Sequence, residues 1–231
     1  MSKEANITID DARALVSDAA LWPRIRDFLW DFAPQIHGSW LETLSEGHEG
    51  DSVSSLVSGL SSSPRAKRFI LGELHVEPVF HSFPVDDASR LALLDGETLV
   101  GVAKWLGALA CAEELRRVTD KATVHELKSS FPGVYPEVFS YVAYFPGLDQ
   151  VVKKAKGDTV PQKALASGLA ILFTALGQSP APVVERLKMK LPRDFHDLCV
   201  PCGKKERPAA GSAVKKLVKL KFPEAYSLCY L

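Results

Sequence analysis

The sequence has few cysteines, no long apolar run and no cluster of histidines. Its four cysteines (Cys111, Cys199, Cys202 and Cys229) are scattered along 231 residues, which excludes a disulfide framework and favours reduced thiols in a cytosol. No window reaches the ~18 consecutive apolar residues of a membrane-spanning helix, and the opening residues lack the pattern of a secretory signal. We therefore expect a cytoplasmic protein that does not itself insert into a membrane.

An excess of charge of either sign is also absent, because 28 basic residues balance 28 acidic ones. This balance gives no support for binding nucleic acid or an anionic membrane surface. The charge is nevertheless uneven. Residues 1–50 hold four basic and nine acidic residues, a net charge of −5, whereas residues 183–231 hold eleven and five, a net charge of +6. Such opposite ends are typical either of two solvated faces or of two surfaces that contact different partners.

Motifs of catalysis are missing as well. The six histidines show neither His-x-x-x-His nor His-Glu-x-x-His spacing, and nothing in the chain has the glycine pattern of a phosphate-binding loop. One tripeptide, Gly50-Asp51-Ser52, matches the nucleophile block of GDS-type lipases, with Ser52 as the nucleophile. That block requires a hydrophobic strand before the serine, and here the polar segment 45–49 precedes it. We expect no enzyme activity and keep a serine hydrolase as an alternative.

A short cysteine motif near the C-terminus provides the second alternative. His196, Cys199 and Cys202 are spaced His-x-x-Cys-x-x-Cys, and Cys-x-x-Cys allows two thiolates to bind one zinc ion. The chain has no second pair of this kind, and Cys229 lies outside any such motif. Three roles for these cysteines therefore stay open: packing residues, weak metal ligands or a redox pair. If they only pack, the protein needs no cofactor.

What the sequence does contain is helical periodicity. Apolar residues recur with a period of 3.6 through Asp95–Val118, where Gly101 and Gly107 predict close approach by a neighbouring helix. A second long helix is predicted to start near Thr159 and to stop at Gly177. Segments with clean alternation are few. The predicted fold is mainly α, an irregular orthogonal helical bundle in a single domain with little or no sheet.

Composition also divides the chain. We expect residues 1–202 to form a helical core domain with a mobile Ser-rich loop at about 46–64, and 203–231 to form a basic C-terminal helix and tail. The basic helix carries Lys215, Lys216, Lys219 and Lys221 beside an apolar face of Val214, Leu217, Val218 and Leu220. These lysines are either a solvated face or a surface that a partner contacts.

Two aromatic segments are further candidates for partner binding. Trp40 and Leu41 lie in an expected ordered connector, 35–44, because neither side chain would be left in water. Residues 131–147 contain the tripeptide Phe-Pro-Gly twice and an aromatic group of Tyr135, Tyr141, Tyr144 and Phe145. That group is either part of the core or an interface anchor.

Three blocks of the sequence together form a recognisable pattern. The first comprises Phe28-Leu-Trp-Asp-Phe and Ile36-His-Gly-Ser-Trp-Leu, the second Leu93-Leu-Asp with Leu99 and Trp105-Leu-Gly-Ala, and the third Lys221-Phe-Pro-Glu with Leu228-Cys. These blocks resemble the SctK/YscK family of accessory proteins of type III secretion sorting platforms. Gly38 departs from the proline that the family has between His and Ser. The blocks span most of the chain.

This resemblance implies a non-enzymatic adaptor at the cytosolic face of the inner membrane, at the base of an injectisome used in virulence. Such an adaptor links the cytoplasmic domain of the inner-membrane ring protein SctD to the platform protein SctQ, which carries SctL and the ATPase. The alternative hypothesis is a small zinc- or thiol-dependent protein that uses Cys199 and Cys202. Because the two ends differ in charge, we expect each end to contact a different neighbour.

Overall fold

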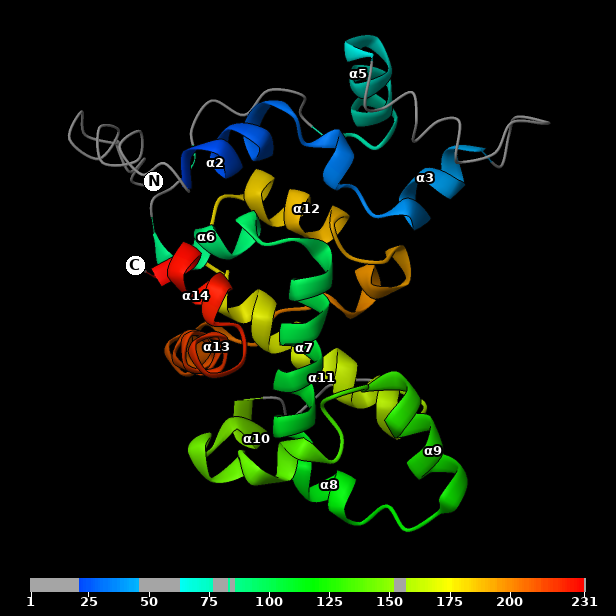
Figure 1. Ribbon diagram of the computed structural model, residues 1–231, viewed down its shortest axis with the longest axis vertical. Helices are drawn as coiled ribbons and strands as arrows, with labels where there is room; N and C mark the ends of the chain where they lie inside the picture. Colours follow the sequence, from blue (N-terminus) through cyan, green and yellow to red (C-terminus); the bar gives the residue numbers. More distant parts are fainter. Residues whose placement is uncertain (1–20, 46–62, 77–82, 84–85, 152–156, 231) are drawn as a thin grey trace. The chain divides into compact units, whose positions relative to one another are not determined.

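The computed structural model describes residues 21–45, 63–76, 83, 86–151 and 157–230. Within these residues every regular element is a helix and no strand occurs (Figure 1). The prediction of a mainly α fold is confirmed. Ser52 and nearly all of the expected Ser-rich loop lie outside the described residues.

The chain divides into two compact units. Unit 1 comprises the described residues up to Gly96 together with Ser179–Arg193, and unit 2 comprises Glu97–Gln178 with Asp194–Tyr230. The boundary expected at residue 203 lies inside unit 2.

Unit 1 is built from short helices around an apolar core. Its side chains with almost no exposure include Ile25, Phe28, Phe32, Ile70 and Leu91. The elements are α2 (Leu21–Trp30), η1 (Ala33–Gln35), α3 (Gly38–Ser45), α5 (Pro64–Glu73), α6 (Asp87–Arg90), η2 (Leu91–Leu93) and α12 (Ala181–Met189). Most of α3 therefore lies within residues 35–44, which we expected to be a connector.

Two buried basic side chains, one in α12 and one just after its end, contact the backbone of other elements in unit 1. Arg186 is 1% exposed, lies over the rings of Phe28 and Phe32, and donates to the backbone carbonyls of Phe28 and, at 3.2 Å, Leu29. Lys190 is 2% exposed, and its Nζ donates to the carbonyls of Ala92 at 2.6 Å and Leu94 at 2.9 Å. The last carbonyls of a helix lack partners within the helix, so both side chains supply donors that helix ends need.

Unit 2 is built around three long helices. Figure 1 shows α7 (Gly96–Ala110), α11 (Val160–Ala175) and α13 (Arg207–Lys221) close together, and α11 packs against both α13 and α9 (Lys121–Ser130). The other helices are α8 (Ala112–Arg116), η3 (Glu137–Ser140), η4 (Val142–Tyr144), α10 (Leu148–Val151), η5 (Arg193–Leu198), η6 (Lys204–Glu206) and α14 (Pro223–Tyr230).

Local signals position α11 as the sequence predicted. The Thr159 hydroxyl accepts from the backbone N–H of Gln162, while the Gln162 side chain accepts from the Thr159 N–H, which makes a capping box. Pro161 occupies the first turn, where its missing N–H costs nothing. The segment expected to be one helix over Asp95–Val118 is instead divided at Cys111 into α7 and α8.

Three Phe-Pro pairs end helices in the same backbone conformation. Phe131, Phe145 and Phe222 have φ between −133° and −123° and ψ between 56° and 63°. A proline disfavours the α conformation in the residue before it, so each pair stops its helix. In the two Phe-Pro-Gly copies the glycines Gly133 and Gly147 then have φ of 71° and 75°, which glycine adopts without steric cost. Each copy is therefore a turn that follows a buried phenylalanine.

None of the helices in the described ranges is both long and apolar enough to cross a bilayer.

Candidate protein-binding surface

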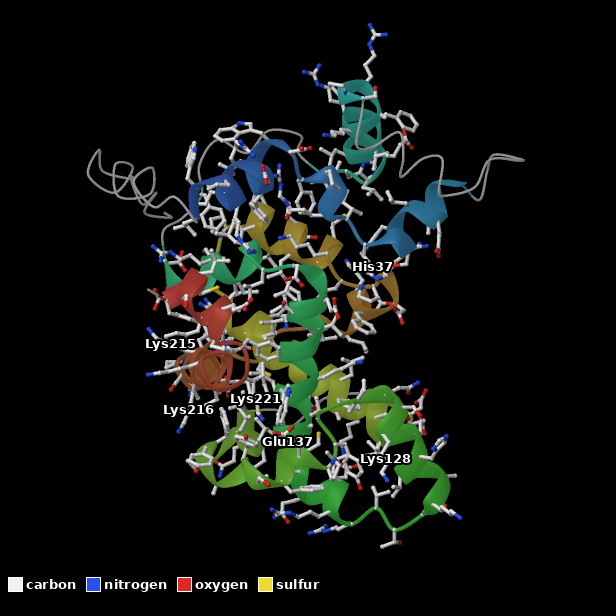
Figure 2. The ribbon with its side chains drawn as sticks, viewed as in Figure 1. His37, Lys128, Glu137, Lys215, Lys216 and Lys221 are labelled. Atoms are coloured by element: carbon white, nitrogen blue, oxygen red, sulfur yellow. The ribbon has the colours of Figure 1, made fainter. Side chains whose placement is uncertain are left out.

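The basic helix α13 has a buried and an exposed side. Val214, Leu217 and Val218 pack into unit 2 with at most 1% exposure, as the apolar face predicted. Leu220, expected on the same face, is instead 46% exposed. It shares the exposed side with Ser212, Lys215, Lys216 and Lys219. Figure 2 shows Lys215 and Lys216 pointing outward from α13, and Lys221 pointing toward Glu137.

Lys221 lies inside unit 2, against aromatic rings. Its Nζ is 4.3 Å from the ring centre of Trp105 and 3.8 Å from that of Tyr141, and it donates to Glu137 at 2.5 Å. Burial opposes the charge, but the interactions with Glu137 and Tyr141 outweigh it and raise the pKa of Lys221. This lysine therefore holds the end of α13 in place and is poorly available to a partner.

Lys216 contacts the aromatic segment more loosely. Its Nζ donates to the Tyr144 carbonyl at 2.8 Å and lies 5.8 Å and 5.7 Å from the ring centres of Tyr144 and Phe145. Phe145 is 7% exposed, whereas Tyr144 is 55% exposed. The aromatic group thus contains both a core residue and an exposed ring.

The two remaining lysines form a regular arrangement with α14. Lys215 Nζ lies 4.9 Å from the ring centre of Tyr230, and Lys219 Nζ lies 5.6 Å from that of Tyr226. The two tyrosine rings are themselves 5.3 Å apart. Lysines one turn apart on α13 therefore cover tyrosines one turn apart on α14. We call these four residues the lysine–tyrosine ladder.

The other expected binding residues lie in unit 1 and contribute to packing. The Trp40 indole N–H donates to the Leu191 carbonyl at 2.9 Å, and Leu41 is 2% exposed. The backbone N–H of His37 also donates to the carbonyl of Met189, the last residue of α12, at 2.9 Å. Since Leu41 is buried, it supports the fold of unit 1 and is not presented at its surface.

The candidate metal ligands do not converge. The Cys199 thiol donates to the Phe195 carbonyl at 3.1 Å, while the Cys202 backbone N–H donates to the Thr174 hydroxyl at 2.7 Å. The described part of the chain contains no group of three or more His, Cys, Asp or Glu side chains able to hold a metal ion. Burial raises the pKa of the Cys111 thiol, which contacts Ser167 at 3.4 Å, and a raised pKa makes a thiol less reactive.

Sequence reasoning missed two features. It did not place Lys215 and Lys219 beside Tyr226 and Tyr230. The two lysines, and likewise the two tyrosines, have the i, i+4 spacing that places side chains on one helix face. It also did not identify the buried Arg186 and Lys190. Arg186 lies in an amphipathic helix and Lys190 directly follows it, and charged residues of such a helix usually face solvent.

Comparison of the chain with family models, curated proteins and solved structures found no match.

The described residues therefore present one basic and aromatic surface, on α13, α14 and η4, as the main candidate site. It carries charge and exposed apolar side chains together, the combination that protein interfaces use.

Proposed function

We propose that this chain is a non-enzymatic adaptor that binds other proteins. The observation that carries the proposal is that each unit leaves large apolar side chains exposed outside a packed core. Unit 1 exposes Trp30 at 52% and Phe69 at 59%, and unit 2 exposes Tyr144 at 55% and Leu220 at 46%. Aromatic side chains supply much of the binding energy of protein interfaces. Two units with separate exposed surfaces suit a protein that joins two partners.

The partners follow from the family resemblance. We propose that they are an SctD-like inner-membrane ring protein and an SctQ-like platform protein, and that the chain acts at the cytosolic face of the inner membrane in a type III secretion injectisome. Several residues that carry the resemblance, such as Phe28, Phe32 and Leu99, are core residues with at most 1% exposure, whereas Trp30 of the first block is exposed. The resemblance thus supports a shared helical scaffold.

Co-purification from cells that produce all three proteins tests this proposal. A tagged full chain is expected to capture both the ring and the platform protein, and crosslink mapping should place contacts on the exposed faces of α2 and α13. The Trp30→Ala variant is expected to lose one partner, since a truncated aromatic anchor commonly costs about 2 kcal/mol or more of binding free energy. Capture of neither protein by the unchanged chain would contradict the proposal.

A further inference from the structure

The lysine–tyrosine ladder has a feature that a solvated charged face does not need. An exposed lysine normally samples many rotamers, and fixing it costs entropy. Here each ammonium lies within the ~6 Å range in which a cation is attracted to an aromatic face, at 4.9 Å for Lys215 and 5.6 Å for Lys219. The rings therefore favour one position for each charge before any partner arrives, which reduces the entropy lost on binding.

Packing within and beneath α14 positions the two tyrosine rings. Tyr226 and Tyr230 pack against each other, and between them on α14 the side chain of Cys229 has no exposure, while Ala225 is 9% exposed. The α14 helix is thus anchored by its small side chains and presents its tyrosines beside α13. The two lysines one turn apart on α13 therefore lie beside two tyrosine rings that contact each other.

The α13 side of the ladder carries positive charge. The α13 sequence contains Arg207 and four lysines and no acidic residue. Lys221 contacts Glu137, and Lys215, Lys216 and Lys219 are exposed on this helix. An anionic ligand is the complementary partner.

We propose that the ladder is a docking surface for an acidic helix of a protein partner, whose carboxylates one turn apart pair with Lys215 and Lys219. This inference rests on the adaptor function proposed above and names the chemistry of one partner. Residues four apart on two helices have the same rise, about 6 Å, so the two lysines match an i, i+4 pair of Glu or Asp on a helix that runs alongside α13.

Apolar contact would complete the interface. Leu220, one turn beyond Lys216 on α13, and Tyr144, which Lys216 contacts, are both exposed. They flank the lysines and offer anchors for leucine-type side chains of an acidic amphipathic helix. The described residues offer no strand edge to which an extended peptide could add, so a helix is the form of partner that fits.

Peptide binding to the full chain tests the inference. The probe is a labelled alanine-based helix of about twenty residues with two Glu pairs at i, i+4 and leucines between them. The control peptide has the same composition with its glutamates spread around the helix. We expect the probe to bind at least about fivefold more tightly than the control peptide in fluorescence anisotropy, with affinity falling as salt rises.

Two double variants separate the ladder from general charge. Lys215→Gln with Lys219→Gln is expected to weaken probe binding about tenfold, the effect of losing roughly 1.4 kcal/mol. Lys121→Gln with Lys128→Gln removes two exposed lysines from α9 of the same unit and is expected to change binding less than twofold. Circular dichroism of each variant verifies folding. Tyr226→Leu with Tyr230→Leu keeps both charges and should weaken binding about threefold, because the lysines lose their ordering rings.

Several results would overturn the inference. These are equal binding of the two peptides, equal loss in the two lysine double variants, no binding at all, or binding only to phosphatidylserine vesicles, which would assign the surface to an anionic membrane. The adaptor function is tested by a separate measurement, the capture of the two partner proteins. If the Lys215/Lys219 variant captures both partner proteins as well as the unchanged chain does, the ladder proposal fails and the adaptor stands.

Discussion

Gly107 of α7 lies so close to Ala164 of α11 that a Cβ added to Gly107 would stand 1.8 Å from the Ala164 carbonyl oxygen. The relationship is reciprocal, because a Cβ on Gly168 would stand 1.8 Å from the carbonyl oxygen of Ala103. The helices α7 and α11 therefore cross with their backbones in close contact. This contact explains why each of the two helices contains a helix-disfavouring glycine at the crossing.

Replacement of Gly107 by alanine should destabilise unit 2. A methyl group meets backbone that has no freedom to move aside, so we expect the free energy of unfolding to fall by about 3 kcal/mol. Gly211→Ala is the matched control, since Gly211 lies within α13 and a Cβ there meets no atom within 4 Å. The control should gain about 0.5–1 kcal/mol. Urea unfolding measures both, and equal effects of the two substitutions would refute the close crossing.

The buried Lys190 should make stability depend on pH in an uncommon direction. Burial lowers its pKa from 10.5 to about 7, with Asp95 opposing the shift and Arg24 adding to it. Between about pH 7 and 10 the unfolded chain then binds more protons at this site than the native chain. Stability from this group therefore rises with pH, by about 1 kcal/mol per pH unit, and is at its minimum below pH 7.

The Lys190→Met variant isolates that contribution. Unfolding free energies of the unchanged chain and the variant, measured from pH 7 to 9, should differ by an amount that grows with pH, because only the former releases this proton on folding. Lys128→Met, at an exposed position of α9, should give a curve parallel to that of the unchanged chain. Parallel curves for Lys190→Met would show that Lys190 is not held in the environment described.

Thiol reactivity should follow burial. Cys111, Cys199 and Cys229 are at most 9% exposed, and Cys202 is more accessible. In the native chain iodoacetamide should label Cys202 first, because the other thiols cannot reach the solvent as thiolates. In guanidinium all four should react at similar rates. Peptide mass spectrometry resolves the sites, and early labelling of Cys199 would contradict the structure.

Gly38 offers a test of the departure from the family pattern. It is the first residue of α3, and a Cβ there meets no atom within 4 Å. Proline is favoured at the first position of a helix, where its N–H is not needed. Gly38→Pro should therefore raise the thermal midpoint, with a gain of about 0.5 kcal/mol from a less flexible unfolded chain. A fall of more than about 1 kcal/mol in the free energy of unfolding would show that the start of α3 needs the glycine.

The sequence predicted those features that local chemistry determines. The capped start of α11 at Thr159 and the close approach at Gly107 follow from turn residues and helix propensity. Long-range contacts were not predictable in this way. Arg186 binds carbonyls 157 and 158 residues away, and nothing in the local pattern of α12 distinguishes it from a solvated arginine.

The candidate site likewise has features that the local sequence predicts and features that depend on long-range packing. Its lysines were predicted from composition, since α13 is basic along one side. Their separate roles were not, because whether a lysine is buried against Trp105 or stands over Tyr226 depends on how α13 packs against other elements. Lys221 and Lys219, two residues apart, therefore differ in availability although their local sequence is similar.

Bridging is the central claim, and co-elution tests it most directly. The SctD-like cytoplasmic domain and the SctQ-like protein are mixed and run on a size-exclusion column with and without the full chain. The account predicts that the two partners elute apart when mixed alone and together in one larger complex when the chain is added. Partners that stay apart in the presence of the chain, or that co-elute without it, would contradict the account.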